Sequence, residues 1–284
     1  MHKVLIIGAT GNLGRELVSQ LLRADVQVCA MARRPESTGL PEPVEVTYGD
    51  LNIPRTIEEC VEGVERVFLT WQTQPATVPE VIEKIASRVQ HIVFLSNLTV
   101  RDDAETQDYS VTTLHANIER QIQASGASWT FLRPGAFATN ARLWWGRQIT
   151  AGNTVRWPYP DAATSPIHEA DIASVAVQAL CEEGHAGAKY ILTGPESLTQ
   201  RDQIRVIAEV LQRPLSYDEI SPETFRSEMA SVMPASIAEM LLTAWRTATG
   251  TPAVLTSTVE EITGAPARSF RQWAIDHAQD FQQS

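Results

Sequence analysis

The sequence predicts an α/β fold in which a doubly wound parallel sheet is joined to a smaller, mostly helical C-terminal lobe. Short apolar runs alternate with longer helical patterns through the first two-thirds of the chain. This alternation is typical of a parallel sheet that helices cover on both faces. A glycine-rich turn directly follows the first apolar run, and from Ser197 onward the pattern is mostly helical.

Strands are predicted where the apolar runs are short and rich in β-branched or aromatic residues. In chain order they are Lys3–Ile7, Val26–Met31, Val44–Thr47, Arg66–Thr70, His91–Leu95 and Trp129–Leu132, with a later one at Lys189–Leu192. Helices are predicted between these runs, where apolar residues recur at helical spacing. They lie near Asn12–Arg23, Ile57–Val61, Val78–Arg88, Thr112–Ala124 and Ala170–Leu180.

The pattern changes in the segment Gly152–Pro166, which is rich in Pro, Gly and aromatic residues. We therefore expect a sheet domain over residues 1–151 and a smaller lobe over residues 152–284. Residues 167–194 contain a further helix and strand and are expected to return to the sheet. The lobe is expected to bind substrate at the carboxyl edge of the sheet, where ligands of open α/β sheets bind.

The composition is that of an ordinary globular protein and excludes several classes of function. Of the 284 residues, 43% are hydrophobic and 20% are charged. The net charge of −11 argues against a general nucleic-acid-binding surface. No apolar run approaches the ~18 residues of a membrane span. We expect a cytoplasmic protein, a monomer or homodimer, without nucleic-acid or membrane partners.

Metal and hydrolase chemistry find no support in the sequence. The three cysteines, Cys29, Cys60 and Cys181, are far apart and show no C-x-x-C spacing, which favours small core residues in a reduced compartment. The six histidines are scattered, so no metal site is predicted. The G-x-S-x-G turn of serine hydrolases is absent.

A glycine motif, Gly8-x-x-Gly11-x-x-Gly14, connects the first predicted strand to the first predicted helix. Glycines let the backbone turn sharply and approach a pyrophosphate, which then lies on the N–H groups of the helix start. The sequence therefore predicts a Rossmann-like dinucleotide-binding unit, against the alternative of a turn with only a structural role. The other cofactor contacts expected in this turn are Thr10, Asn12 and Leu13.

Two arginines after the second predicted strand indicate which dinucleotide is bound. NAD-binding units carry an acidic residue about 20 positions past the glycines, where it accepts the ribose 2′-OH. Here Arg33 and Arg34 follow that strand, and a guanidinium favours a 2′-phosphate. The sequence thus predicts NADPH. Alternatively these are solvated loop charges, and Arg15 is a second candidate for the phosphate contact.

Further segments complete a pattern that covers nearly the whole chain. They are Gly49-Asp50-Leu51, His115-x-x-x-Glu119, Trp129–Gly135, Glu169–Ala173, Tyr190–Pro195 and Ser269–Ala274. In this order, and with the glycine motif, they resemble the NmrA-like, NAD(P)H-binding family of atypical short-chain dehydrogenases. The resemblance implies that Asp50 and Leu51 lie near the adenine. It implies further cofactor contacts at Thr70, Trp71, Ser96, His115, Pro134 and Phe137.

The chain departs from ordinary short-chain dehydrogenases at the pair Tyr-x-x-x-Lys, in which the phenol gives a proton to the substrate carbonyl. Alignment on Glu119 places Val111 at the tyrosine position and His115 at the lysine position. Several NmrA-like proteins also lack the pair. Some of them are quinone or dye reductases and others are cofactor-sensing regulators, so the resemblance leaves both functions open.

Three residues are candidates for the missing proton chemistry. His115 has an ordinary pKa close to neutrality, Tyr109 lies two residues before Val111, and Ser96 ends the fifth predicted strand. Each has a simpler alternative. His115 would only bind the ribose, Tyr109 would be a surface loop residue, and Ser96 would only cap the end of a strand.

An acceptor that delocalises the arriving electrons, such as a quinone, an enone or an iminium-like compound, needs no strong acid. Residues expected to line a pocket for it are Trp71, Phe137, Asn140, Trp144 and Trp157, since aromatic walls stack on flat ligands. The alternative is that the tryptophans anchor the small lobe.

We therefore predict an NADPH-dependent reductase of a small, aromatic, quinone-like, enone or ketone substrate. The second hypothesis is a non-catalytic NADP(H)-sensing regulator that binds a protein partner. A third is a cofactor-holding scaffold for non-redox chemistry.

Overall fold

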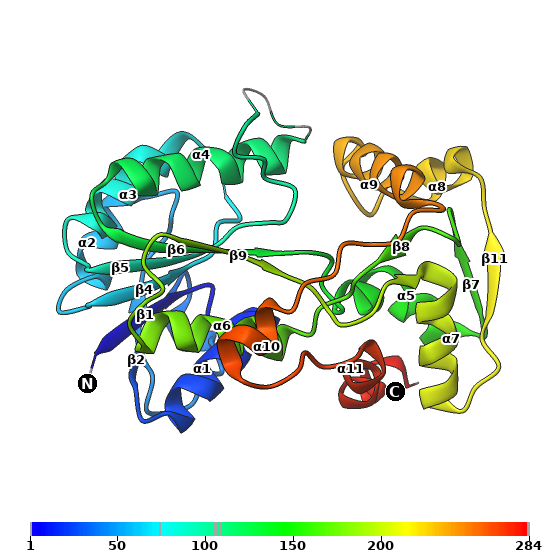
Figure 1. The fold of residues 1–284 in the computed structure, drawn as a ribbon, viewed down its shortest axis with the longest axis horizontal. Coiled ribbons are helices and arrows are strands. Elements are labelled where there is room, and N and C mark those ends of the chain that lie inside the picture. Colours follow the sequence, from blue (N-terminus) through cyan, green and yellow to red (C-terminus); the bar gives the residue numbers. More distant parts are fainter. Residues whose placement is uncertain (1, 74, 105–106, 108, 283–284) are drawn as a thin grey trace. The chain divides into compact units, whose positions relative to one another are not determined.

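The computed structural model describes residues 2–73, 75–104, 107 and 109–282 (Figure 1). The chain forms two compact units. Unit 1 consists of Met1–Pro134, Glu169–Leu192 and Thr258–Ala265, and unit 2 consists of Gly135–His168, Thr193–Ser257 and Pro266–Ser284. The division falls after Pro134, earlier than the sequence-based boundary at residue 151. A third segment, 258–265, also belongs to unit 1, which the sequence pattern did not indicate.

Unit 1 contains a seven-stranded, fully parallel sheet, which confirms the predicted fold class. Its strands are β1 (Lys3–Ile7), β2 (Gln27–Ala32), β3 (Glu45–Tyr48), β4 (Arg66–Leu69), β5 (His91–Leu95), β6 (Ser128–Pro134) and β9 (Ala188–Leu192). Their order across the sheet is β3-β2-β1-β4-β5-β6-β9. The strand order therefore reverses next to β1, and the crevice at such a point is where open α/β sheets bind ligands.

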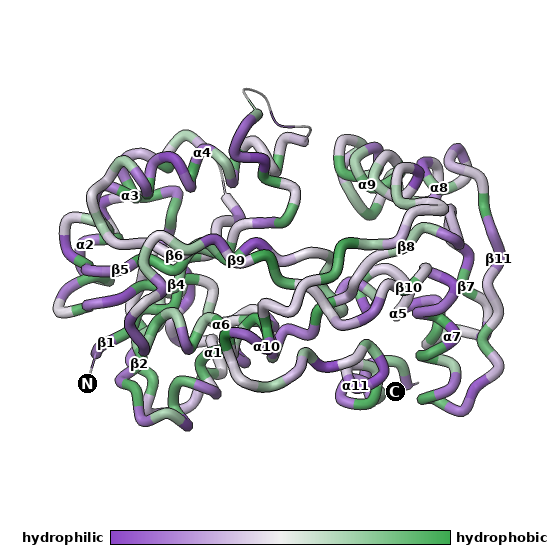
Figure 2. Tube along the Cα trace, in the orientation of Figure 1, coloured by the Kyte–Doolittle hydropathy of each residue, from purple (hydrophilic) through white to green (hydrophobic). Residues whose placement is uncertain are grey.

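Helices cover both faces of this sheet, as a parallel sheet requires. Figure 1 shows α3 and α4 on one face and α1 and α6 on the other. The helices of unit 1 are α1 (Asn12–Arg23), α2 (Ile57–Cys60), α3 (Val78–Ala86), α4 (Ser110–Ala124), α6 (Glu169–Cys181) and α10 (Thr258–Thr263). α1 packs against α6, and Gln20 of α1 donates to the Ala170 carbonyl of α6 at 3.0 Å. Leu17, Val18 and Leu21 of α1 are buried, and Figure 2 shows apolar and polar residues alternating along this helix.

Unit 2 is built from helices and two small sheets around an aromatic core. Its elements are α5 (Asn140–Ala151), β7 (Thr154–Trp157), β8 (Ala163–Thr164), β10 (Leu198–Thr199), α7 (Gln200–Leu211), β11 (Ser216–Glu219), α8 (Pro222–Met229), α9 (Ala235–Ala248) and α11 (Phe270–Asp276). β7 pairs with β11 in parallel, and β8 pairs with β10 in antiparallel. The region after Ser197 was expected to be mostly helical, and α7 to α9 and α11 are helices there. The two strand pairs, β7–β11 and β8–β10, were not predicted.

Membrane-spanning helices and metal-binding clusters are both absent from the described residues. No helix in that part of the chain has both the length and the apolar character needed to cross a membrane. Within the same ranges, His, Cys, Asp and Glu side chains do not gather in groups of three able to hold a metal ion. Cys29, Cys60 and Cys181 are free thiols.

Candidate functional site

Several predicted cofactor residues of unit 1 lie at the carboxyl edge of its sheet. Because all seven strands are parallel, their carboxyl ends lie at one edge. Gly8 follows β1, Arg33 follows β2 and Thr70 follows β4. Ser96 follows β5, and Pro134 ends β6. The fold thus brings together residues that are spread over more than a hundred positions of the sequence.

The glycine turn after β1 is held in a shape that only glycine accepts at two positions. Gly8 has a φ of +99°, and a Cβ there would lie 2.3 Å from Thr70 Oγ1. A Cβ on Gly14 would lie 2.1 Å from the backbone oxygen of Gly8. Thr70 Oγ1 in turn donates a hydrogen bond to the carbonyl of Ile7, at 3.0 Å. Close packing of the turn against β4 and α1 therefore fixes the backbone.

The start of α1 has the features of a phosphate-binding cradle. Gly11 is its N-cap residue, no side chain caps the helix, and the first turn holds no acidic residue. The N–H groups at the helix start therefore lack a competing side-chain acceptor, and the helix dipole favours an anion there. A Cβ on Gly11 would meet the Gly8 oxygen at 3.5 Å, an ordinary contact. Thr10 and Asn12 are exposed and Leu13 is buried. These residues fit a dinucleotide pyrophosphate.

The arginines near the turn differ in what they contact. Arg33 is exposed and has no ion-pair or hydrogen-bond partner within the described ranges. Arg34 is also exposed, and its carbonyl accepts from Ser37. Arg15 donates to three carbonyls, those of Thr10 at 3.1 Å, Gly39 at 3.0 Å and Thr38 at 2.6 Å.

Arg15, a candidate phosphate ligand by sequence, therefore ties the glycine turn to the loop after β2. The guanidinium of Arg33, by contrast, has no partner among the described residues.

The residues expected near the adenine lie in tightly bonded loops. Asp50 Oδ1 accepts from the backbone N–H of Asn52 at 2.9 Å and from its Nδ2 at 3.0 Å. Leu51 is buried. Trp71 is also buried, and its Nε1 donates to the carbonyl of Thr73 at 3.2 Å. Trp71 is packed in the apolar cluster of unit 1, so its ring has a structural role there.

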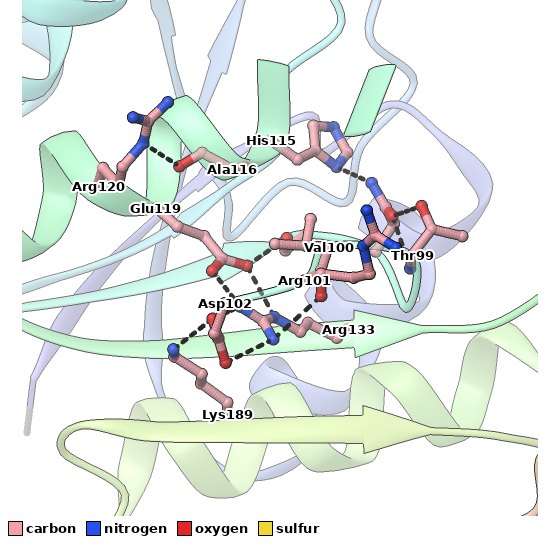
Figure 3. Close-up of polar contacts among 12 residues, drawn as sticks. Thr99, Val100, Arg101, Asp102, His115, Ala116, Glu119, Arg120, Arg133 and Lys189 are labelled. Atoms are coloured by element: carbon pink, nitrogen blue, oxygen red, sulfur yellow. Dashed lines mark hydrogen bonds and ion pairs between the residues drawn. The ribbon is translucent and has the colours of Figure 1, made fainter. Parts of the chain in front are cut away.

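Ser96 takes part in a buried network of hydrogen bonds and ion pairs, whose charged members Glu119 on α4 and Arg133 on β6 are drawn in Figure 3. Its Oγ donates to Glu119 Oε1 at 2.5 Å. Arg133 donates to the same carboxylate from Nε at 3.0 Å and from Nη2 at 2.5 Å. Ser96, Glu119 and Arg133 are all buried. The hydroxyl proton of Ser96 is thus engaged by Glu119, so Ser96 in this network has no free proton for a substrate carbonyl.

Arg133 also anchors the loop that follows β5. It donates to Asp102 Oδ1 from Nη2 at 2.7 Å, and Lys189 donates to the same oxygen at 2.7 Å. These partners, Arg133 first, lower the pKa of Asp102 to about 2. Burial disfavours the charged form of Arg133, but the hydrogen bonds to Glu119 and Asp102 outweigh this and raise its pKa. Asp102 and Arg133 therefore both remain charged at neutral pH.

His115 lies near this network on α4 and is uncharged at neutral pH. Its Nδ1 lies 2.8 Å from Asn97 Nδ2, and its ring contacts Phe94 edge to face at a centroid distance of 5.5 Å. Burial lowers the pKa of His115 to about 4. Val111, four residues earlier, is on the same helix and exposed. His115 can donate a hydrogen bond at neutral pH, but it does not supply an imidazolium proton.

Tyr109, the third candidate, is the N-cap residue of α4 and is half-buried. Its carbonyl accepts from the N–H of Thr113 at 2.8 Å and from Thr113 Oγ1 at 3.0 Å. These backbone contacts fix where the helix begins, and within the described residues the phenol makes no hydrogen bond to the buried network.

The remaining pocket candidates belong to unit 2. Trp157 is 1% exposed and packs against Phe225 at 5.0 Å and Trp245 at 5.5 Å between ring centroids. It is thus a core residue of unit 2. Trp144 is half-buried and contacts Trp245 at 5.3 Å. Phe137 and Asn140 are half-buried, and the N–H of Asn140 donates to the Phe137 carbonyl at 3.1 Å.

Sequence reasoning missed Asn97 and Asp102. Both lie in the loop after β5 and have partners far along the chain. Asn97 contacts His115, 18 residues away, and Asp102 contacts Arg133 and Lys189, 31 and 87 residues away. Nothing in the local sequence marks them, since their contacts depend on how β5, α4 and β6 assemble. Arg133 and Glu119 stood within the quoted motifs, but their pairing was not foreseen.

Comparison with known proteins gives consistent results. A family model described as NAD(P)H-binding matches residues 8–183. The (4-alkanoyl-5-oxo-2,5-dihydrofuran-3-yl)methyl phosphate reductase of Streptomyces griseus is 36% identical over 98% of this chain and 99% of its own length. The NAD(P)H azoreductase of Xenophilus azovorans is 31% identical over 98% of this chain and 99% of its own length.

Solved structures share the fold. An NADPH-dependent quinone oxidoreductase from Escherichia coli superposes with a TM-score of 0.80 at 22% identity, covering 97% of this chain and 99% of that chain. A mutant of NmrA superposes with a TM-score of 0.73 at 16% identity, over 97% of this chain and 94% of that chain.

Proposed function

This chain belongs to the NmrA-like, NAD(P)H-binding family of atypical short-chain reductases, and we propose that it reduces a small conjugated acceptor with NADPH. It is an NAD(P)H-dependent oxidoreductase. The acceptors that we propose are quinones, enones and aromatic ketones. In the overall reaction the acceptor gains a hydride and one proton, and the cofactor leaves as NADP+.

The proposal rests first on the alignment by Glu119, in which Val111 and His115 stand at the positions of the usual Tyr-Lys pair. A valine has no proton to give, and His115, half-buried and with its pKa lowered to about 4, is neutral. Such a site suits an acceptor whose π system spreads the arriving charge, because orientation of the two reactants then does most of the work.

The names of the relatives support the same class of acceptor. They describe reduction of an alkanoyl dihydrofuranone phosphate, of an azo compound and, at 25% identity over 84% of this chain, of a quinone. An unsaturated lactone, an azo group and a quinone are all conjugated and electron-poor. We extend that shared property to the substrate of this chain.

Several groups of unit 1 support cofactor binding in defined roles. The glycine turn and the N–H groups at the start of α1 would hold the pyrophosphate. Arg33, exposed and unpaired within the described ranges, would hold a 2′-phosphate and favour NADPH over NADH. When bound, NADPH supplies the hydride. His115 would donate a hydrogen bond to the atom on which negative charge develops.

A turnover assay tests the function. The purified protein is mixed with NADPH and a panel of quinones, enones, azo dyes and aromatic ketones, and loss of the reduced-nicotinamide absorbance is followed. We expect turnover of at least one conjugated acceptor and none of a saturated ketone. Tight NADPH binding without any turnover would instead favour a cofactor-sensing regulator, and a protein partner would then be sought by pull-down.

We also propose that the protein works in the cytoplasm as a monomer or homodimer. Its three thiols are free, which suits a reducing compartment. Light scattering during size-exclusion chromatography gives the oligomeric state.

A further inference from the structure

The imidazole of His115 makes its hydrogen bond to the side-chain amide of Asn97 (Figure 3). Asn97 Nδ2 lies 2.8 Å from His115 Nδ1. An amide NH2 group can only donate, so Nδ1 must be the acceptor. In the neutral ring the proton is then on Nε2. The contact with Asn97 therefore selects one of the two imidazole tautomers.

The orientation of the Asn97 amide is fixed by the backbone. Its Oδ1 accepts from the N–H of Thr99 at 2.9 Å and from Thr99 Oγ1 at 2.5 Å. A backbone N–H only donates, so the oxygen and nitrogen of the amide cannot exchange places without losing this bond. Nδ2 is therefore the atom that faces His115.

The chain of hydrogen bonds continues back to α4. Thr99 gives its one hydroxyl proton to Asn97, so in the 2.6 Å contact between Thr99 and Thr112 the donor is Thr112. Thr112 is fully buried on α4, three residues before His115. Donors thus point in one direction, from Thr112 through Thr99 to Asn97 and on to His115.

Two other observations support a neutral ring with an available donor. Phe94 packs edge to face on the ring, and burial lowers the pKa of His115 to about 4. Nε2 of His115 has no hydrogen-bond partner within the described ranges. It is also not one of the fully buried side-chain atoms that lack a partner. The N–H at Nε2 is therefore open to a bound molecule.

We propose that Asn97 is a positioning residue that fixes the Nε2–H tautomer of His115, so that this ring presents a neutral hydrogen-bond donor to the reduced acceptor. The part played at the acceptor rests on the proposed reductase function, whereas the tautomer is a property of the free protein. The ring stabilises charge that develops on an oxygen or nitrogen of the acceptor. The proton that completes the reduction comes from water.

The primary test is NMR of the protein labelled with 15N at histidine, without ligand. In the wild type we expect His115 to show an unprotonated Nδ1 and a protonated Nε2 at neutral pH. In N97D one carboxylate oxygen still accepts from the Thr99 N–H, and the other faces Nδ1 as an acceptor. We expect the tautomer to invert in N97D and the pKa of His115 to rise.

Two further variants separate the tautomer from packing. T112V removes the buried hydroxyl at the other end of the chain but leaves Asn97 held by the Thr99 N–H, so we expect lower stability and the wild-type tautomer. N97A removes the donor, and we expect a mixture of tautomers. If N97D does not fold, the tautomer of His115 in N97A tests the proposal instead.

The kinetic arm uses the best acceptor of the turnover panel. We expect kcat of N97D to fall roughly 100-fold, as for loss of one preorganised donor, with the KM for NADPH unchanged. T112V should retain the wild-type kcat.

The outcomes are distinct. A protonated Nδ1 in the wild type, a wild-type tautomer in both N97D and N97A, or inversion in T112V overturns the proposal for Asn97. Absence of turnover in the wild type, with the tautomers as expected, overturns only the reductase function and leaves the tautomer assignment intact.

Discussion

At the scale of single residues, we propose that the choice of cofactor depends most directly on Arg33. Its guanidinium follows β2 and is exposed and unpaired within the described ranges. We expect R33D to weaken NADPH binding roughly tenfold or more, because a charge-assisted bond is lost and repulsion is added. Binding of NADH should weaken less or improve. Fluorescence titration with both cofactors measures this.

R88D is a suitable control, since Arg88 is exposed just after α3, at the opposite edge of the sheet. It carries the same change of charge and should leave the ratio of the two affinities unaltered. An unchanged ratio in R33D would mean that Arg34 or another group holds the phosphate.

Gly14 and Gly11 differ in what they tolerate, although both belong to one motif. A Cβ on Gly14 would lie 2.1 Å from the backbone oxygen of Gly8, whereas a Cβ on Gly11 would lie 3.5 Å from it. G14A should therefore cost about 1–3 kcal/mol of unfolding free energy, as overpacking of rigid backbone does. G11A should cost less than G14A. Denaturant unfolding compares them, and equal stability of G14A and wild type would contradict the packing geometry.

At the scale of elements, the pair of Glu119 on α4 and Arg133 on β6 joins the helix to the sheet. R133M leaves the Glu119 carboxylate buried without its arginine partner. We therefore expect the free energy of unfolding to fall by about 3–5 kcal/mol. The double variant R133M/E119Q removes the uncompensated charge and should recover part of the loss. Urea unfolding measures all three proteins. A double variant less stable than R133M would show that Glu119 stabilises the fold without Arg133.

The elements that were predicted well are those whose signal is local. β1, β5 and α1 match their predicted bounds, because each is a buried run or an amphipathic stretch. The α4 helix begins two residues earlier than expected, at Ser110. The pairing of β7 with β11 was not predicted, since it joins Thr154 to Ser216 across a long stretch of chain and each strand has four residues.

In the candidate site, too, residues with a local sequence signal were predicted, whereas contacts between distant segments were not. The glycine turn was predictable because its three glycines lie within seven residues, although the packing of Gly8 against Thr70 depends on the assembled sheet. Ser96 was recognised as a residue at the end of a strand, but its bond to Glu119 depends on the docking of α4. The role of Asn97 depends on a contact 18 residues away, and no local pattern encodes it.

At the scale of the whole molecule, buried histidines make stability depend on pH. His91 Nε2 and Nδ1 lie 2.9 Å from Thr130 Oγ1 and Ser128 Oγ, and Thr130 donates onward to the His185 carbonyl at 2.7 Å. Thr130 must therefore accept from Nε2, which carries a proton. Burial, with Arg66 nearby, lowers the pKa of His91 to about 4.

Because the folded pKa lies below the ordinary value of 6.5, the unfolded chain binds more protons between these values. The contribution of His91 is complete above pH 6.5 and is lost as the pH falls towards 4, by about 3 kcal/mol in full. His115 acts in the same direction. Thermal unfolding from pH 7 to 4 should show this loss, and H91Q should reduce its slope. An identical slope in H91Q would exclude His91 as its source.

The order in which the two units share the chain has a consequence for biosynthesis. α6 and β9 lie in Glu169–Leu192, so the ribosome must first make Gly135–His168 of unit 2 before the sheet of unit 1 gains its last strand. Until then β6 is an edge strand with free N–H and C=O groups, and the face of β4 to β6 that α6 packs against is uncovered. A nascent chain at this length therefore carries an apolar surface and an open strand edge, the features that recruit chaperones and promote aggregation.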